Sequence, residues 1–64
     1  MNLVKPNSSW WEVHFKQDNY SYWCFNRYAS SLEEALEAKK DLEKNEFFLN
    51  CKIRILKITA EEVV

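Results

Sequence analysis

The stretch from Trp10 to Tyr28 constrains the fold more than any other part of this chain, because it holds eight of the ten aromatic residues. Within it, apolar and polar residues alternate with a period of two, which is typical of β-strands. The two alternating runs, 10–16 and 20–28, are separated by the segment 17–19, whose Asp and Asn favour a turn. The pattern therefore predicts a β-hairpin with a three-residue turn.

The length of this turn decides which aromatic rings share a face of the sheet, because a shift of one residue moves every side chain of a strand to the other face. A two-residue turn would leave Trp23 and Phe25 among the charged residues. We favour the three-residue turn, because it separates the indole and phenyl rings from the tyrosines and the charges. It places Trp11, Val13, Phe15, Trp23 and Phe25 on a core face, and Trp10, Glu12, His14, Lys16, Tyr20, Tyr22, Cys24 and Asn26 on the opposite face.

A helix is predicted over residues 32–44, where apolar residues recur at helical spacing. Ser31 and Glu34 match a capping box, and Ser30 and Glu33 offer the same box one residue earlier. The two glutamates also suit the positive end of the helix dipole. The sequence therefore predicts where this helix begins.

The segment after the helix predicts a stop, a connection and a third strand. Asn45 is expected to end the helix in the left-handed conformation, since the chain contains no glycine. Phe47 and Phe48 are expected to cap the core beneath the last helical turn. The run 51–59 is rich in β-branched residues and predicts the third strand.

These elements predict one small α+β domain, 1–64, with the order β-β-α-β. We expect a loose lead-in over 1–9, a core over 10–59 and a tail over 60–64. A right-handed crossover places the third strand beside the first and parallel to the second, in the sheet order 2-1-3. The helix then covers one face of the sheet and leaves the other face open.

Composition argues against several classes of function. A chain without glycine cannot form a P-loop or a dinucleotide fingerprint, and one histidine with two separated cysteines does not make a usual zinc site. In the favoured register His14 and Cys24 lie diagonally on one face, but a nucleophilic pair also needs an orienting residue. We therefore expect no enzyme activity, no cofactor and no metal.

Charge and hydropathy bear on the partner and the location. The net charge is −1, which argues against a protein whose main task is to hold a phosphate backbone. Residues 1–9 lack the apolar core of a secretory signal, and no apolar run approaches the length of a membrane span. We therefore expect a cytoplasmic protein that does not enter a membrane.

Three segments together resemble small phage and prophage proteins: WEVHF at 11–15, YASSLEEA at 28–35 and KIRILKI at 52–58. This resemblance implies a protein that binds a host factor. Inhibitors of bacterial defence systems, including anti-CRISPR proteins, belong to this class.

We accordingly expect a small protein-binding module, a phage-type inhibitor that blocks a host defence protein through the sheet face opposite the helix. Aromatic residues and arginine suit such contacts. The expected contact residues are Trp10, His14, Tyr20 and Tyr22, with Lys16 and Arg54 at the rim.

Three alternatives stay open. The same aromatic and basic face could bind single-stranded nucleic acid, with bases stacked on its rings. A homo-oligomer could act as a sponge for a nucleotide-like signal, with Arg27 or Arg54 holding a phosphate. The acidic side of the helix could itself be the contact surface, with Glu33, Glu37 and Asp41 mimicking phosphates.

Overall fold

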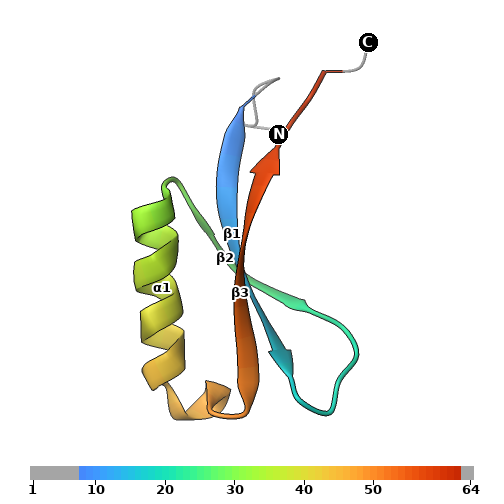
Figure 1. Cartoon of the computed structure of the whole chain (residues 1–64), viewed down its shortest axis with the longest axis vertical. Coiled ribbons are helices and arrows are strands. Elements are labelled where there is room, and N and C mark those ends of the chain that lie inside the picture. Colours follow the sequence, from blue (N-terminus) through green and yellow to red (C-terminus); the bar gives the residue numbers. More distant parts are fainter. Residues whose placement is uncertain (1–7, 63–64) are drawn as a thin grey trace.

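The computed structural model describes residues 8–62, which form a three-stranded sheet with one long helix against it (Figure 1). The strand order is β2-β1-β3, and β1 is antiparallel to both neighbours. This arrangement confirms the predicted α+β fold and the order 2-1-3. The elements are β1 (Ser9–Gln17), β2 (Cys24–Ala29), α1 (Leu32–Lys44), a 3-10 helix η1 (Glu46–Phe48) and β3 (Cys51–Thr59).

The predicted end segments are described only in part. Residues 1–7 of the predicted lead-in, 1–9, lie outside the described residues. The same holds for residues 63–64 of the predicted tail, 60–64. Within the described part, β1 already begins at Ser9, and the backbone N–H of Ala60 donates to the carbonyl of Ser8 over 2.8 Å. The pairing of β1 with β3 therefore continues one step beyond both strands.

The predicted three-residue turn is wrong, because six residues, 18–23, connect β1 to β2. The chain turns where the N–H of Tyr20 donates to the carbonyl of Gln17 over 3.0 Å, but pairing with β1 resumes only at Cys24. Instead of pairing with β1, Tyr20 and Tyr22 stack on each other, with ring centroids 5.4 Å apart. Their alternation with polar residues imitates a strand, although they belong to the loop.

A β-bulge at Asn26 sets the faces of β2. Val13 pairs with Arg27, whereas the next residue of β1, His14, pairs with Phe25, so Asn26 is the extra residue. Phe25 consequently shares a face with His14 and is 49% exposed. The prediction that Trp23 and Phe25 belong to the core face is therefore wrong for both residues, since Trp23 also lies on the His14 side, beside Arg54.

The helix forms over the predicted residues, 32–44, and its first turn is capped as expected. The Ser31 hydroxyl accepts from the N–H of Glu34 over 3.1 Å. The Glu34 carboxylate accepts from the hydroxyl and the N–H of Ser30, which lowers the pKa of Glu34. Ser31 therefore caps the helix through its side chain, while Ser30 provides the reciprocal hydrogen bonds.

The end of the helix differs from the prediction. Asn45 has φ −86° and ψ 128°, so its backbone is extended and the predicted left-handed stop is wrong. The N–H of Asn45 still donates to the carbonyl of Leu42, over 3.1 Å, while its side-chain oxygen accepts from the N–H of Phe47 over 2.9 Å. Asn45 thus ends α1 and begins η1, a double role that needs extended backbone between two helices.

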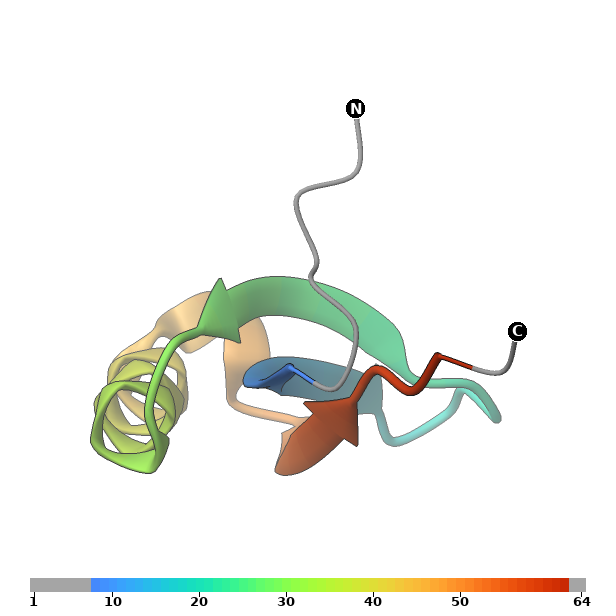
Figure 2. The ribbon, with the colours of Figure 1, turned by 90° about the horizontal axis from the view of Figure 1, so that it is seen from above.

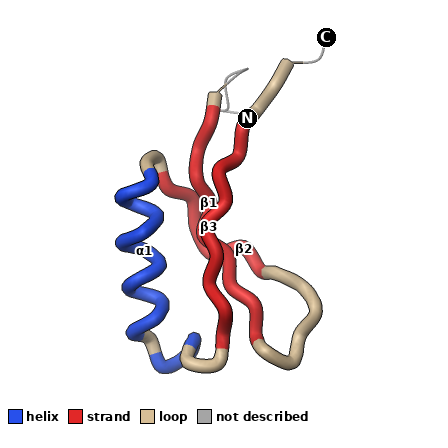
Figure 3. The backbone as a smooth tube through the Cα atoms, in the orientation of Figure 1, coloured by secondary structure: helices blue, strands red, loops and turns tan. Residues whose placement is uncertain are grey.

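The helix α1 lies against one face of the sheet (Figure 2, Figure 3), and the core lies between them. Its buried side chains are mostly small. Phe48 packs against it, edge to face with Phe15 at a centroid distance of 5.0 Å. Phe47 is 86% exposed, so its predicted place in the core is wrong. Alanines on α1 and β2 let the helix approach the sheet closely. The buried residues are Val13, Ala29, Ala35, Ala38 and Leu42, and partly buried Trp11, Phe48, Ile53 and Ile55 surround them.

Candidate functional site

The candidate site is the face of the sheet that points away from α1, which we call the open sheet face. Val13 and Ala29 are buried against the helix, so the residues that alternate with them on the paired strands face the other way. Figure 2 shows α1 on one side of the sheet and the β1–β2 loop on the other. The open sheet face holds Trp10, Glu12, His14 and Lys16 from β1, Phe25 and Tyr28 from β2, Lys52, Arg54, Leu56 and Ile58 from β3, and Trp23 from the loop.

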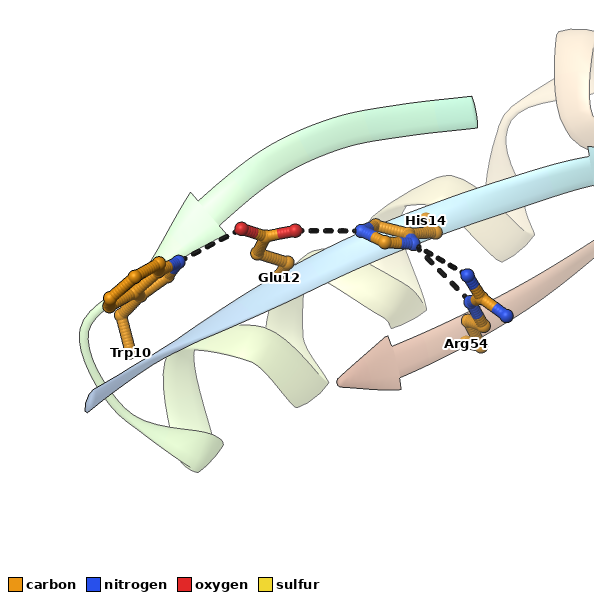
Figure 4. Close-up of polar contacts among 4 residues, drawn as sticks. All are labelled: Trp10, Glu12, His14 and Arg54. Carbon is orange, nitrogen blue, oxygen red and sulfur yellow. Dashed lines mark hydrogen bonds and ion pairs between the residues drawn. The ribbon is translucent and has the colours of Figure 1, made fainter. Parts of the chain in front are cut away.

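A chain of hydrogen bonds runs along the middle of this face (Figure 4). The indole Nε1 of Trp10 donates to Oε2 of Glu12 over 2.9 Å, and Oε1 of Glu12 lies 2.9 Å from Nε2 of His14. The other ring nitrogen of His14, Nδ1, accepts from Nε and Nη2 of Arg54 at 3.3 and 3.1 Å. Trp10, Glu12 and His14 are spaced two residues apart on β1, and Arg54 is directly opposite His14 on β3. Because side chains alternate between the faces of a sheet, these four side chains lie on one face and can contact each other.

The network holds the Glu12 carboxylate in its charged form. Hydrogen bonds from Trp10 and then His14 lower the pKa of Glu12, against a smaller opposing effect of burial. Within the network both ring nitrogens of His14 are occupied, one by Glu12 and one by Arg54. The arrangement therefore fixes the positions of these side chains relative to one another.

The expected diagonal neighbours His14 and Cys24 are on opposite faces. Phe15 pairs with Cys24, and this places the thiol on the helix side of the sheet, while His14 pairs with Phe25 on the open sheet face. The prediction that they share a face is wrong, because it assumed the register of the three-residue turn. Within the described residues, no group of three or more His, Cys, Asp or Glu side chains could hold a metal ion.

Cations surround the indole of Trp23 at the loop end of the open sheet face. The guanidinium carbon of Arg54 lies 4.3 Å from the ring centroid, and Nζ of Lys16 lies 6.0 Å from it. Lys52 is directly opposite Lys16 on the neighbouring strand. Within the described part of the chain, neither lysine forms an ion pair with an acid. This end of the face is therefore positively charged.

Exposed aromatic rings occupy the β2 side of the same face. The ring centroids of Phe25 and Tyr28 lie 4.7 Å apart, with the rings tilted by 56°. Phe25 also packs edge to face with His14, at a centroid distance of 6.1 Å. Residues three apart on a regular strand would face opposite ways, but the bulge at Asn26 brings both to one face. Tyr28 is 66% exposed. The sequence analysis did not predict this pair; two consecutive polar residues, Asn26 and Arg27, are the signal that the alternation is interrupted.

The predicted contact residues are brought together in part. Trp10, His14, Lys16 and Arg54 share the open sheet face. Tyr20 and Tyr22 do not lie on the strands, since both are exposed in the β1–β2 loop. The acidic side of α1 that was proposed as an alternative is exposed along its length, at Glu33, Glu37 and Asp41.

The chain matches no family model, no curated protein and no solved structure. Neither helix in the described part of the chain is long and apolar enough to cross a membrane. Function is therefore inferred from the open sheet face.

Proposed function

We propose that this chain is a small protein-binding module whose open sheet face contacts a partner protein. The observation that carries the proposal is the exposed pair Phe25 and Tyr28 beside the fixed network of Glu12, His14 and Arg54. Aromatic residues and arginine are enriched at the energetic centres of protein interfaces. Side chains that are already ordered lose less conformational entropy on binding, so this face is prepared for contact.

Protein is favoured over single-stranded nucleic acid because several rings are already engaged within the chain. Arg54 covers a face of Trp23, and Tyr20 and Tyr22 stack on each other with an interplanar angle of 13°. Bases need accessible ring faces and nearby cations that can reach phosphates. Arg54 instead directs two of its nitrogens to His14, so the face offers fewer stacking and phosphate contacts than its composition indicates.

The nucleotide sponge has less support within a single chain. Arg27 pairs with Val13 on the helix side, away from the exposed rings of the open sheet face, and Arg54 on that face already directs two nitrogens to His14. A nucleotide sponge would need a site formed between copies. For a phage-type protein the partner is a host protein, and inhibition follows if the open sheet face covers a surface that the host protein needs.

The proposal is tested by affinity capture from a bacterial lysate, with and without nuclease. The tagged chain is compared with the double variant Phe25→Ala/Tyr28→Ala. We expect the wild type to retain a protein after nuclease treatment and the double variant to lose it. Loss of two anchor rings at an interface commonly weakens binding by about 2 kcal/mol or more per ring, which is enough to abolish capture.

A matched control removes two exposed apolar side chains away from the open sheet face. Phe47 and Leu49 are both exposed and lie at the connection between α1 and β3. The double variant Phe47→Ala/Leu49→Ala should capture the same protein as the wild type. Capture that disappears with nuclease, or that persists in Phe25→Ala/Tyr28→Ala with an unchanged circular dichroism spectrum, would contradict the proposal.

A further inference from the structure

The two edges of the sheet are unequal. The β2 edge is six residues long and interrupted by the bulge at Asn26, whereas β3 pairs with β1 over nine residues without a shift in register. Short strands and bulges are devices that prevent another strand from adding to an edge. Within the described residues, β3 is therefore the edge that is open to strand addition.

The direction of the backbone groups of β3 follows from the hydrogen bonds at its two ends. Ala60 donates to Ser8, and Asp18 donates to Asn50 over 3.2 Å, so these opposite residues are the hydrogen-bonded pairs of the antiparallel ladder. Even-numbered residues of β3 consequently direct N–H and C=O toward β1. The odd-numbered residues Cys51, Ile53, Ile55, Lys57 and Thr59 direct theirs toward the free edge.

The charge of β3 indicates what kind of strand would pair with it. Lys52, Arg54 and Lys57 are its charged residues, and it contains no acid. Lys52 also faces Lys16 directly across the ladder, and like charges in that position are destabilising. A carboxylate beside Lys52 would relieve this repulsion.

We propose that the free edge of β3 binds an extended acidic segment of a partner protein by strand addition. Main-chain hydrogen bonds provide affinity in this mode, and alternate side chains provide specificity. In the antiparallel orientation, an acidic residue of the added strand lies beside Lys52, and the residues that alternate with the acidic ones lie beside Ile53 and Ile55. A second copy of the chain fits less well, because pairing β3 with itself brings the cations of both strands to one edge.

This inference rests on the proposed function in taking a protein as partner, but it uses a different surface. The probe is a blocked eight-residue peptide of alternating Glu and Val, and the control peptide has Lys in place of Glu. Isothermal titration calorimetry should detect binding of the acidic peptide only. The affinity should fall as salt is raised, because the charges are exposed and screened.

Two methylated peptides test whether the backbone carries the binding. Residues of the added strand that are paired with Ile53, Ile55 and Lys57 have side chains on the helix side, so in the antiparallel orientation these are the Val residues. Methylation of the Val nitrogens should abolish binding, and methylation of the Glu nitrogens should be tolerated. The reverse result would show a parallel strand, which also supports addition at this edge. Equal effects of the two methylations, or equal binding of the Lys peptide, would overturn the proposal.

A protein variant checks the location. Lys57→Pro removes an N–H that points to the free edge, while Lys57→Thr removes the same charge and keeps the N–H. We expect Lys57→Pro to weaken peptide binding about tenfold more than Lys57→Thr, since one main-chain donor is lost at an otherwise paired edge. The peptide should still bind Phe25→Ala/Tyr28→Ala, so failure of this inference is separable from failure of the proposed function. Dimers of the chain that the peptide does not dissociate would show that a second copy occupies the edge.

Discussion

Leu42 provides a sharp test of how α1 is attached to the sheet. It is a leucine of the last helical turns with 3% of its surface exposed, whereas Leu36 on the same helix is 46% exposed. Truncating a buried leucine to alanine costs about 2 to 5 kcal/mol, and a domain of this size has about 3 to 5 kcal/mol of stability in total. The substitution Leu42→Ala should therefore remove most of the free energy of unfolding.

The magnitude can be worked through for a central case. If the wild type unfolds with about 4 kcal/mol and Leu42→Ala costs about 3 kcal/mol, about one molecule in six is unfolded without denaturant. With a urea dependence of about 1 kcal/mol per molar, the midpoint falls by about 3 M. Leu36→Ala makes the same change in helix propensity but removes a side chain that is already half in water, so its cost should stay below about 1 kcal/mol.

Urea unfolding followed by circular dichroism at 222 nm measures both variants under one set of conditions. The difference between the two free energies of unfolding isolates burial, since both substitutions replace Leu by Ala within α1. Equal losses of stability in Leu42→Ala and Leu36→Ala would refute the packing of α1 described above.

Three further outcomes follow from local contacts. Ser31→Ala should cost about 0.5 to 2 kcal/mol by removing the helix cap, while Ser21→Ala in the loop should be neutral in the same unfolding assay. Hydrogen bonds in the folded chain lower the pKa of Glu12. Its contribution to the free energy of unfolding is therefore full above the ordinary pKa of a glutamate and is lost as the pH falls through the lowered pKa. Glu12→Gln should make the stability less dependent on pH in the acid range. Deleting Asn26 should keep the fold and regularise the β2 edge, and sedimentation should then show association that increases with concentration; a monomer at all concentrations would contradict the protective role of the bulge.

The parts of the fold that the sequence predicted are those with local signals. The helix over 32–44 depends on a serine cap and a glutamate three residues later, which act within one turn. The strand over 51–59 depends on β-branched residues whose preference for extended backbone is also local. Both elements have the predicted bounds for this reason.

The hairpin could not be predicted in the same way, because its register depends on distant contacts. The segment 20–22 alternates like a strand, yet Tyr20 and Tyr22 pack on each other. Ala29 is buried in the same core cluster as Val13 and the alanines of α1, and this burial fixes the helix end of β2. From Ala29 to the loop, β2 has one residue more than the segment of β1 with which it pairs. The extra residue is Asn26, which forms the bulge.

The residues of the candidate site also differ in whether the sequence could predict their place. Trp10, His14 and Lys16 share a face whatever the hairpin register, because they alternate on one strand, and Arg54 joins them through the regular pairing of β3. Phe25 and Tyr28 share that face only because of the bulge. The part of the open sheet face that lies on β1 and β3 was therefore predictable from parity, and the exposed aromatic pair on β2 was not.

The bulge on β2 also sets a limit on assembly. A sheet that can be extended at both edges can add chain after chain and grow into a fibre, because each addition leaves a new edge of the same kind. With β2 interrupted, residues 8–62 of each copy present one regular edge, at β3. Two copies that paired through β3 would leave only their interrupted β2 edges exposed, so we expect such pairing to stop at two copies rather than grow into a fibre.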